Sequence, residues 1–327
     1  MELSNEVELE GLEVHGADGV DETRPTVREY GSGEKTVGFV TGSHGDEKGP
    51  QELVNEVMDS IDADVRVSVI NPANPSAAED FSRRTSPRVQ QNRADEADLN
   101  RSWMTAKKFL DGELEKQDIN TTALIASRYL DYLRENVDIV VDLHTGTYPT
   151  RKAPQFRYIQ GDEVMTEAAT KAGVEAVLET KHDPGKGTLR STLFDDNKPA
   201  GTVEVGGAAR PGDRSGFSEE EEEKYSSIIE NLVRHFSGEE MEEVETEKYT
   251  DIEKVHAPSA GIVRYRQDLG SEVEPGDTVA VIEDYDGEVR EEVNAGYEGM
   301  LETVNTGSGR NVNEGNRIFN IARREKE

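Results

Sequence analysis

A histidine and a glutamate stand three residues apart in the segment GSHGDE, where His44 and Glu47 follow an apolar run and lie among glycines. A second histidine, His144, ends the apolar run DIVVDLH and is followed by Thr and Gly. Two histidines and one carboxylate are the three protein ligands of a catalytic zinc site, which leaves a fourth position for water. A His-x-x-Glu pair alone is more often part of a solvated turn. The second histidine at an equivalent strand end makes a metal site the favoured interpretation.

A further carboxylate, Glu204, lies in the apolar segment TVEVGG. Strand alternation places Val203 and Val205 on one face and Glu204 on the other. The ordinary interpretation is a strand carboxylate that points to solvent, but the glycine pair that follows also marks a strand end at a crevice. A partly buried carboxylate beside a metal-bound water is what a general base for hydrolysis requires.

The elements that must position these residues alternate between about residues 36 and 236. We expect strands over residues 36–42, 65–70, 138–144, 156–160 and 202–206, and helices over residues 50–61, 124–135 and 218–236. The last helix begins with Ser218 and Glu221 as a capping box. Alternation of this kind predicts an α/β domain with a parallel or mixed sheet, whose strand ends meet at one crevice. Residues 71–118 are mostly polar, and we expect them to form a long functional loop.

Residues 237–251 have no apolar periodicity and predict a linker between a catalytic domain, residues 1–240, and a β-rich domain, residues 251–327. The second domain contains an internal repeat. Ala257-x-x-x-Gly261 followed by Val273-x-x-Gly276 returns as Ala295-x-x-x-Gly299 followed by Val312-x-x-Gly315. Two such halves resemble the small all-β barrel-sandwich of biotinyl/lipoyl type. The hairpin between the halves, EDYDGEV, has no lysine to carry a prosthetic group, which excludes the carrier function.

Composition excludes several classes of protein. The net charge of −32, from 69 acidic and 37 basic residues, is tolerable where salt screens it, so we expect a halophilic host. No Lys/Arg cluster indicates nucleic-acid binding, and no apolar run approaches the roughly 18 residues of a membrane span. Without cysteine there is no thiolate nucleophile or ligand. The acidic start, MELSNEVELE, is unlike a secretory signal and predicts a cytoplasmic protein.

Four segments in this order, GSHGDE, DLNR, DLHTG and VEVGG, resemble the succinylglutamate desuccinylase/aspartoacylase family, whose catalytic domain has the zinc carboxypeptidase fold. The resemblance spans residues 36–236 and, more loosely, the C-terminal domain. It implies a mixed sheet flanked by helices and one Zn²⁺ per chain, bound by His44, Glu47 and His144. It also implies that Glu204 is the base that activates the metal-bound water, and it is compatible with a homo-oligomer.

The resemblance implies substrate-binding residues as well. Asn100 and Arg101 match a pair that grips a substrate carboxylate, a task that suits a planar guanidinium. Arg93 matches the arginine that polarises the scissile carbonyl and stabilises its oxyanion. For each arginine, an ordinary surface ion pair is the alternative in a chain this acidic.

Three further residues are candidates. Arg190 resembles another arginine that recognises a carboxylate, and Tyr297 resembles a substrate-facing tyrosine that the C-terminal domain lends to the site. Asp142 lies two residues before His144, hence on the same strand face, where it can orient the imidazole of that ligand. The interval from Arg190 to Glu204 is longer than in aspartoacylases, so the resemblance does not point to N-acetylaspartate.

The function that the resemblance implies is zinc-dependent hydrolysis of the amide bond of a small N-acyl amino acid, with an acetyl or succinyl group. Neither the acyl group nor the amino acid follows from the sequence. A metallocarboxypeptidase acting on short peptides would use the same zinc chemistry and is the nearest alternative. A non-catalytic binding protein of the same fold is another, although such a protein has no need of both the ligand set and the base.

Overall fold

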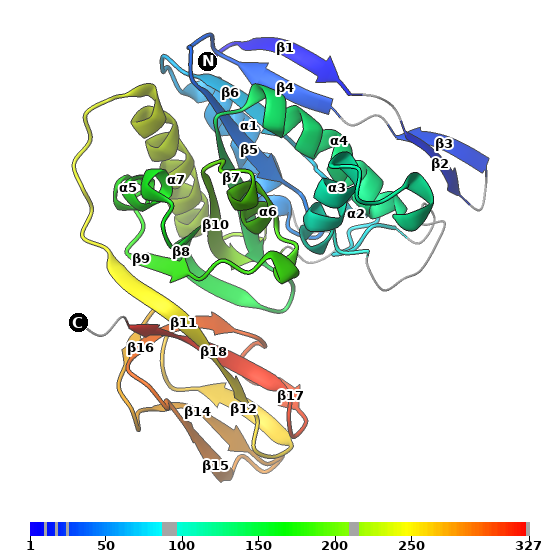
Figure 1. Cartoon of the computed structure of the whole chain (residues 1–327). Helices are drawn as coiled ribbons and strands as arrows, with labels where there is room; N and C mark the ends of the chain where they lie inside the picture. The colour runs from blue at the N-terminus through cyan, green and yellow to red at the C-terminus, as the bar shows by residue number, and fades with distance from the viewer. Residues whose placement is uncertain (10–11, 17–18, 24–25, 87–96, 209–215, 325–327) are drawn as a thin grey trace.

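The computed structural model describes residues 1–9, 12–16, 19–23, 26–86, 97–208 and 216–324. Figure 1 shows a larger part, in which helices surround a sheet, above a smaller part made of strands, from which the C-terminus emerges. One 12-stranded sheet runs through both parts.

The long sheet has the order β1-β4-β6-β5-β7-β10-β8-β9-β11-β18-β16-β13. Its strands are β1 (Leu3–Glu8), β4 (Thr26–Tyr30), β5 (Thr36–Thr41), β6 (Arg66–Ile70), β7 (Ile139–Gly146), β8 (Arg151–Ile159), β9 (Ala176–Thr180), β10 (Ala200–Gly207), β11 (Glu247–His256), β13 (Glu272–Val273), β16 (Gly299–Val304) and β18 (Arg317–Arg324). The central strands β6, β5, β7 and β10 are parallel, and β8 is antiparallel to β10. The predicted mixed α/β sheet is therefore confirmed. A separate hairpin contains β2 (Leu12–Gly16) and β3 (Gly19–Thr23).

Helices cover both faces of the sheet. One face packs against α1 (Lys48–Ser60), α5 (Glu163–Lys171) and α7 (Glu219–Ser237), and the other against α3 (Trp103–Leu110), α4 (Thr121–Asn136) and α6 (Leu189–Asp195). Because both faces are covered, the central strand β5 is buried along its whole length and reads as an apolar run. The predicted capping box of α7 is present: Ser218 Oγ accepts from the Glu221 N–H, and Glu221 Oε2 accepts from the Ser218 N–H.

The expectation of one long loop over residues 71–118 is wrong in part. This region contains α2 (Pro75–Glu79) and α3, with the short 3₁₀ helices η2 (Leu99–Arg101) and η3 (Lys116–Asp118); η4 (Pro184–Lys186) lies later in the chain. In α3, Trp103 and Ala106 are buried in the core that also contains α4, and Leu110 packs against it. These three residues stand at the helical spacing i, i+3 and i+7, a local pattern that the sequence analysis did not use.

The predicted linker is also shorter than expected, because β11 begins at Glu247. There the strand pairs in parallel with β9 and then antiparallel with β18, so the sheet continues from the α/β part into the β-rich part. The boundary between residues 1–240 and 251–327 stays a prediction. A second, four-stranded sheet of the β-rich part contains β12 (Gly261–Tyr265), β14 (Thr278–Glu283), β15 (Val289–Asn294) and β17 (Asn311–Val312).

The internal repeat of the sequence is a structural repeat. Strands β12, β13 and β14 of the first half correspond to β16, β17 and β18 of the second, and the halves exchange short strands, since β12 pairs with β17 and β16 with β13. The glycines that start the halves meet the same constraint. A Cβ on Gly261 would lie 2.5 Å from the Glu283 carbonyl oxygen, and one on Gly299 would lie 2.0 Å from that of Ala322. The two halves enclose one apolar core between their sheets.

Candidate metal centre

The candidate ligands lie at the ends of two neighbouring parallel strands, at one edge of the sheet. His44 and Glu47 lie in the loop between β5 and α1, and His144 lies near the end of β7, which pairs with β5. The loop passes so close to α2 that a Cβ on Gly45 would lie 1.9 Å from the carbonyl carbon of Ala77. Glycine at this position therefore lets the backbone carry both side chains inward.

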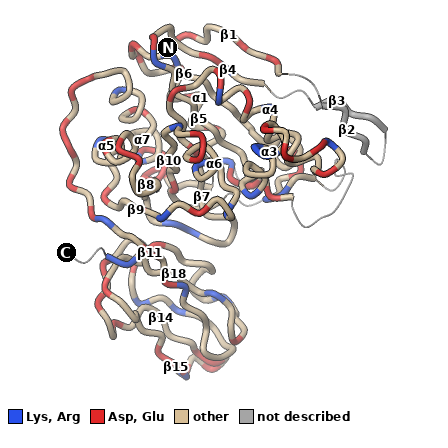
Figure 2. The backbone as a smooth tube through the Cα atoms, viewed as in Figure 1, with Lys and Arg blue, Asp and Glu red and all other residues tan. Residues whose placement is uncertain are grey.

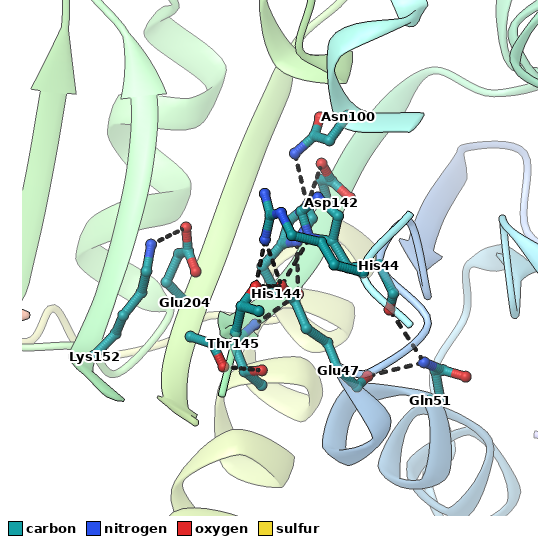
Figure 3. A network of polar contacts seen from close by, with 12 residues as sticks. His44, Glu47, Gln51, Asn100, Asp142, His144, Thr145, Lys152 and Glu204 are labelled. Carbon is teal, nitrogen blue, oxygen red and sulfur yellow. Dashed lines mark hydrogen bonds and ion pairs between the residues drawn. The ribbon is translucent and has the colours of Figure 1, made fainter. Parts of the chain in front are cut away.

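The three side chains converge as the sequence predicted. One ligand atom from each of His44, Glu47 and His144 lies within 4.8 Å of the other two, and all three residues are buried. Nδ1 of His44 is 2.7 Å from Glu47 Oε1, and Nδ1 of His144 is 2.9 Å from Glu47 Oε2 (Figure 3). No other group of three such side chains gathers in this way among the residues that the structure describes.

Each imidazole also contacts a second carboxylate, through its Nε2 atom. Nε2 of His44 lies 3.0 Å from Asp98 Oδ1, and Nε2 of His144 lies 2.8 Å from Asp142 Oδ2. Such outer carboxylates orient an imidazole so that its other nitrogen faces the metal position. Asp142 therefore lies where its predicted role requires. Asp98 was not identified from the sequence, although it opens the DLNR segment two residues before Asn100.

The electrostatics favour a cation. Burial would raise the pKa of the Glu47 carboxyl, but His44 and His144 outweigh it and hold that pKa well below its usual range. Burial would lower the pKa of His144, but Asp142 and Glu47 outweigh it and raise that pKa well above the ordinary value. Two inward Nδ1 atoms and one ionised carboxylate form a donor set that fits Zn²⁺.

Glu204 lies beside this group on the next strand. In the parallel pairing of β10 with β7 it is opposite His144, while Val203 and Val205 pack into the core on the other face. Its side chain lines a cavity of about 460 Å³ that also contains the candidate ligands. Burial would raise the pKa of the Glu204 carboxyl. The positive charges of Lys152, whose Nζ is 2.6 Å from Oε1, and of Arg157 have the larger effect, so the pKa is lower than its usual value. Glu204 is thus an ionised carboxylate, able to accept a proton.

The cavity concentrates positive charge in a strongly acidic protein. Six cationic residues line it: Arg83, Arg101, Lys152, Arg157, Arg190 and Arg317. The acidic members of the described lining are Glu47 and Glu204. Anionic groups of a ligand would therefore find partners in this cavity. Of the six cations, sequence analysis identified only Arg101 and Arg190; of the other four, Lys152 and Arg157 lie in β8, Arg317 in β18 and Arg83 after α2, and they share no motif.

The predicted substrate-binding residues that the structure describes in the α/β part also line the cavity. Asn100 Nδ2 lies 3.0 Å from His144 Nε2, and its Oδ1 accepts from the Leu189 N–H at 3.2 Å. Arg101 donates from Nη1 to the Asn100 carbonyl at 2.6 Å. Burial and, after it, the charge of Arg157 lower the pKa of the Arg190 guanidinium to about 10. In the described part of the chain Nε of Arg190 has no hydrogen-bond partner, which suits it to an anionic ligand.

The two remaining candidates differ. Arg93 lies outside the described residues. Tyr297 is 44% exposed, its ring packs against the Arg323 guanidinium at 3.2 Å, and it is not part of the cavity lining. The structure therefore does not bring Tyr297 to the candidate site, because its contact with β18 holds it elsewhere. Among the described residues of the β-rich part, Arg317 lines the cavity.

Comparison with known proteins agrees with this geometry. Residues 34–236 match the family model of the succinylglutamate desuccinylase/aspartoacylase catalytic domain. A succinylglutamate desuccinylase from Silicibacter is similar in structure, with 20% identity, a TM-score of 0.75, and coverage of 99% of this chain and 97% of that chain. The product-bound ectoine utilization protein EutE (DoeB) from Ruegeria pomeroyi has 20% identity and a TM-score of 0.74, with the same coverage of 99% and 97%. At these identities the likeness shows the fold alone. No curated protein matches the chain.

Proposed function

The chain belongs to the succinylglutamate desuccinylase/aspartoacylase family, and from this premise we propose that it hydrolyses the amide bond of a small N-acyl amino acid. In this proposal His44, Glu47 and His144 bind one Zn²⁺, and Glu204 is the general base. The observation that carries it is the convergence, in one cavity, of three buried ligand atoms within 4.8 Å of one another and a carboxylate on the adjacent strand.

In the proposed reaction the metal and Glu204 have separate roles. When bound, zinc supplies Lewis-acid activation of water and of the scissile carbonyl. Lys152 occupies Glu204 Oε1, whereas Oε2 is buried and has no hydrogen-bond partner among the described residues. We therefore assign Oε2 as the atom that accepts the proton of the attacking water and later passes it to the leaving amine.

Substrate binding falls to the cationic residues of the cavity. Asn100 and Arg101 bind a carboxylate of the substrate, Arg190 binds a second anionic group, and Arg93 stabilises the oxyanion, as the family resemblance implies. A cavity of about 460 Å³ is of a size that suits a small molecule. The acyl group, acetyl or succinyl, and the amino acid are to be identified by assay.

The test combines metal analysis with catalysis. Zinc content is measured in the wild type and in Glu204→Gln, and amine release is assayed on N-acetyl and N-succinyl amino acids. We expect one zinc per chain in both proteins and a loss of about 10²- to 10⁴-fold in kcat for Glu204→Gln. Glu291→Gln, an exposed strand glutamate of β15, is the matched control and should retain full activity. Absence of stoichiometric zinc from both proteins would contradict the proposed zinc site.

The alternatives give different results in the same assay. A metallocarboxypeptidase would release amino acids from dipeptides faster than from N-acyl amino acids. A binding protein would bind zinc and substrate without turnover in the wild type. The buried Glu204, with one oxygen unpartnered among the described residues, favours the hydrolase, because binding alone does not require a proton acceptor there.

Charge distribution supports a further part of the proposal. Figure 2 shows acidic residues spread along both parts of the molecule, in accord with the net charge of −32. We propose that the protein functions at high salt, where self-repulsion is screened.

We also propose that the C-terminal domain is a barrel-sandwich of biotinyl/lipoyl type. Each helix in the described part of the chain is too short or too polar to cross a membrane. A cytoplasmic location and a homo-oligomer stay predictions.

A further inference from the structure

A group of polar side chains is buried where the C-terminal domain joins the α/β part. Strand β16 pairs with β8 at Thr303 and Lys152, and next to this pairing Glu302 is fully buried. Its Oε1 accepts from Gln155 Nε2 at 2.9 Å and from Arg157 Nη2 at 2.5 Å. Its Oε2 accepts from Asn320 Nδ2 at 3.1 Å and from the neighbouring Thr303 hydroxyl. Four donors therefore hold this carboxylate, which leaves its position well determined.

The same contacts determine where Arg157 points. Nε of Arg157 donates to Gln155 Oε1 at 2.9 Å, and Nη2 donates to Glu302, so two of its three nitrogens are engaged away from the candidate base. The remaining nitrogen, Nη1, is 3.7 Å from Glu204 Oε1, beyond hydrogen-bond distance. Lys152 makes the shorter ion pair with Glu204, at 2.6 Å (Figure 3).

Without Glu302 this arrangement would change. Gln155 would still engage Nε, but Nη1 and Nη2 would be free, and two such nitrogens form a bidentate pair with a nearby ionised carboxylate. Among the described residues Glu204 is that carboxylate, and a bidentate pair would occupy Oε2, which must accept a proton, as well as Oε1.

We propose that Glu302, on the C-terminal domain, is a positioning residue for the base of the α/β part: it holds Arg157 back from Glu204 and so keeps Glu204 Oε2 open. This inference rests on the proposed function of Glu204. It assigns the C-terminal domain a part in catalysis through β16, in addition to the direct contribution of Arg317 to the cavity lining. A stabilising ion pair at a domain junction is the competing explanation.

Three variants separate the two explanations: Glu302→Gln, Arg157→Met, and the double variant. We expect Glu302→Gln to lower kcat about 10- to 100-fold with a smaller change in KM, since misplacement of a catalytic group acts mainly on the chemical step. Because the defect comes from Arg157 moving onto Glu204, adding Arg157→Met should raise kcat back to the level of Arg157→Met alone. A merely structural ion pair predicts no such recovery, and a double variant at least as impaired as Glu302→Gln would overturn the proposal.

The matched control is Glu272→Gln. Glu272 also lies in the long sheet and pairs with an arginine, Arg324 at 2.9 Å, but it does not line the cavity. Because this ion pair is partly exposed, Glu272→Gln should change the stability little and should keep the wild-type kcat. If Glu302→Gln does not fold, Glu302→Asp and Asn320→Ala replace it, the first shortening the carboxylate and the second removing one of its donors.

A readout independent of turnover is the crystal structure of Glu302→Gln, or of its replacement variant. We expect a guanidinium nitrogen of Arg157 within about 3.2 Å of Glu204 Oε2. An Arg157 that stays in its wild-type position would refute the positioning role whatever the activity. Conversely, absence of wild-type turnover on every substrate would refute the proposed function, while the crystallographic result would still decide whether Glu302 controls Arg157.

Discussion

The two sides of the cavity are built in opposite ways. The metal side consists of His44, Glu47 and His144 with their outer partners Asp98 and Asp142, and its three inner residues come from two adjacent strand ends. The cationic side consists of Lys152, Arg157, Arg190 and Arg317, which come from β8, α6 and β18 in both parts of the molecule.

The two sides also differ in how their charge is balanced. On the metal side the two histidines lie between the carboxylates of Glu47, Asp98 and Asp142. Arg83 pairs with Asp98 at 3.2 Å and lies 3.6 Å from Glu47, so the three carboxylates outnumber this one arginine and favour a further cation. On the cationic side, Nε of Arg190 has no partner among the described residues, so that side favours an anion. Glu204 lies between them, with Lys152 on one oxygen. The difference supports the proposal that separate sets of residues in one cavity bind a metal and an anionic substrate.

Removal of the metal should have the largest effect and should involve only the metal side. Dialysis against a chelator is expected to abolish turnover, and Zn²⁺ should restore it. At a zinc concentration of about 100 times the dissociation constant, binding should add about 2.7 kcal/mol to the free energy of unfolding. His182→Ala, which changes a histidine paired with Asp195 outside the cavity, is the control and should bind zinc normally. Undiminished turnover by the stripped protein would contradict this prediction.

A change on the cationic side should act on substrate affinity instead. Arg190→Met is expected to raise KM about 10- to 100-fold, because a hydrogen bond to a charged group contributes about 1.5–3 kcal/mol. Zinc stoichiometry should not change. Steady-state kinetics and metal analysis on the same preparation test this, and a loss of zinc in Arg190→Met would show that the two sides are not independent.

Stability at low pH provides a third test, through Glu302. Burial would raise the pKa of its carboxyl, but Arg157 and Lys152 lower it from 4.5 to about 2. A pKa that is lower in the folded state stabilises the fold above pH 4.5, and this contribution disappears as the pH falls toward about 2. The difference in unfolding free energy between the wild type and Glu302→Gln, measured by urea denaturation, should therefore shrink on acidification. A difference that does not vary with pH would contradict this coupling.

The smallest effect is expected from a residue on neither side. Ser218→Ala removes the side-chain cap of α7 and should lower the free energy of unfolding by about 1 kcal/mol. Because α7 contributes no residue to the cavity lining, kcat, KM and zinc content should stay at their wild-type values. A change in any of the three would mean that general stability, rather than local geometry, governs the differences between the two sides.

Sequence reasoning was successful where the relevant order is local. Alternation along β10 correctly placed Val203 and Val205 in the core and Glu204 on the opposite face. The apolar runs that precede His44 and His144 correctly indicated neighbouring strand ends. Where order depends on distant contacts, the predictions were incomplete or wrong. The start of β11 was taken for linker, and Tyr297 was expected at the site, whereas it does not line the cavity.

The sequence by itself placed the candidate ligands and Glu204 at neighbouring strand ends, because side-chain direction in a strand has a period of two and parallel strands end at one edge. Their roles as metal ligands and base follow from the family resemblance and stay proposals. Apart from Arg190, only the tertiary structure decided the cationic side. Arg157 and Glu302 are 145 residues apart in the chain, and their contact exists because β16 pairs with β8. Single cationic residues have no periodicity or spacing from which such a contact could be predicted. Their contacts depend on which strands become neighbours, and this is decided by the pairing of strands that lie far apart in the sequence.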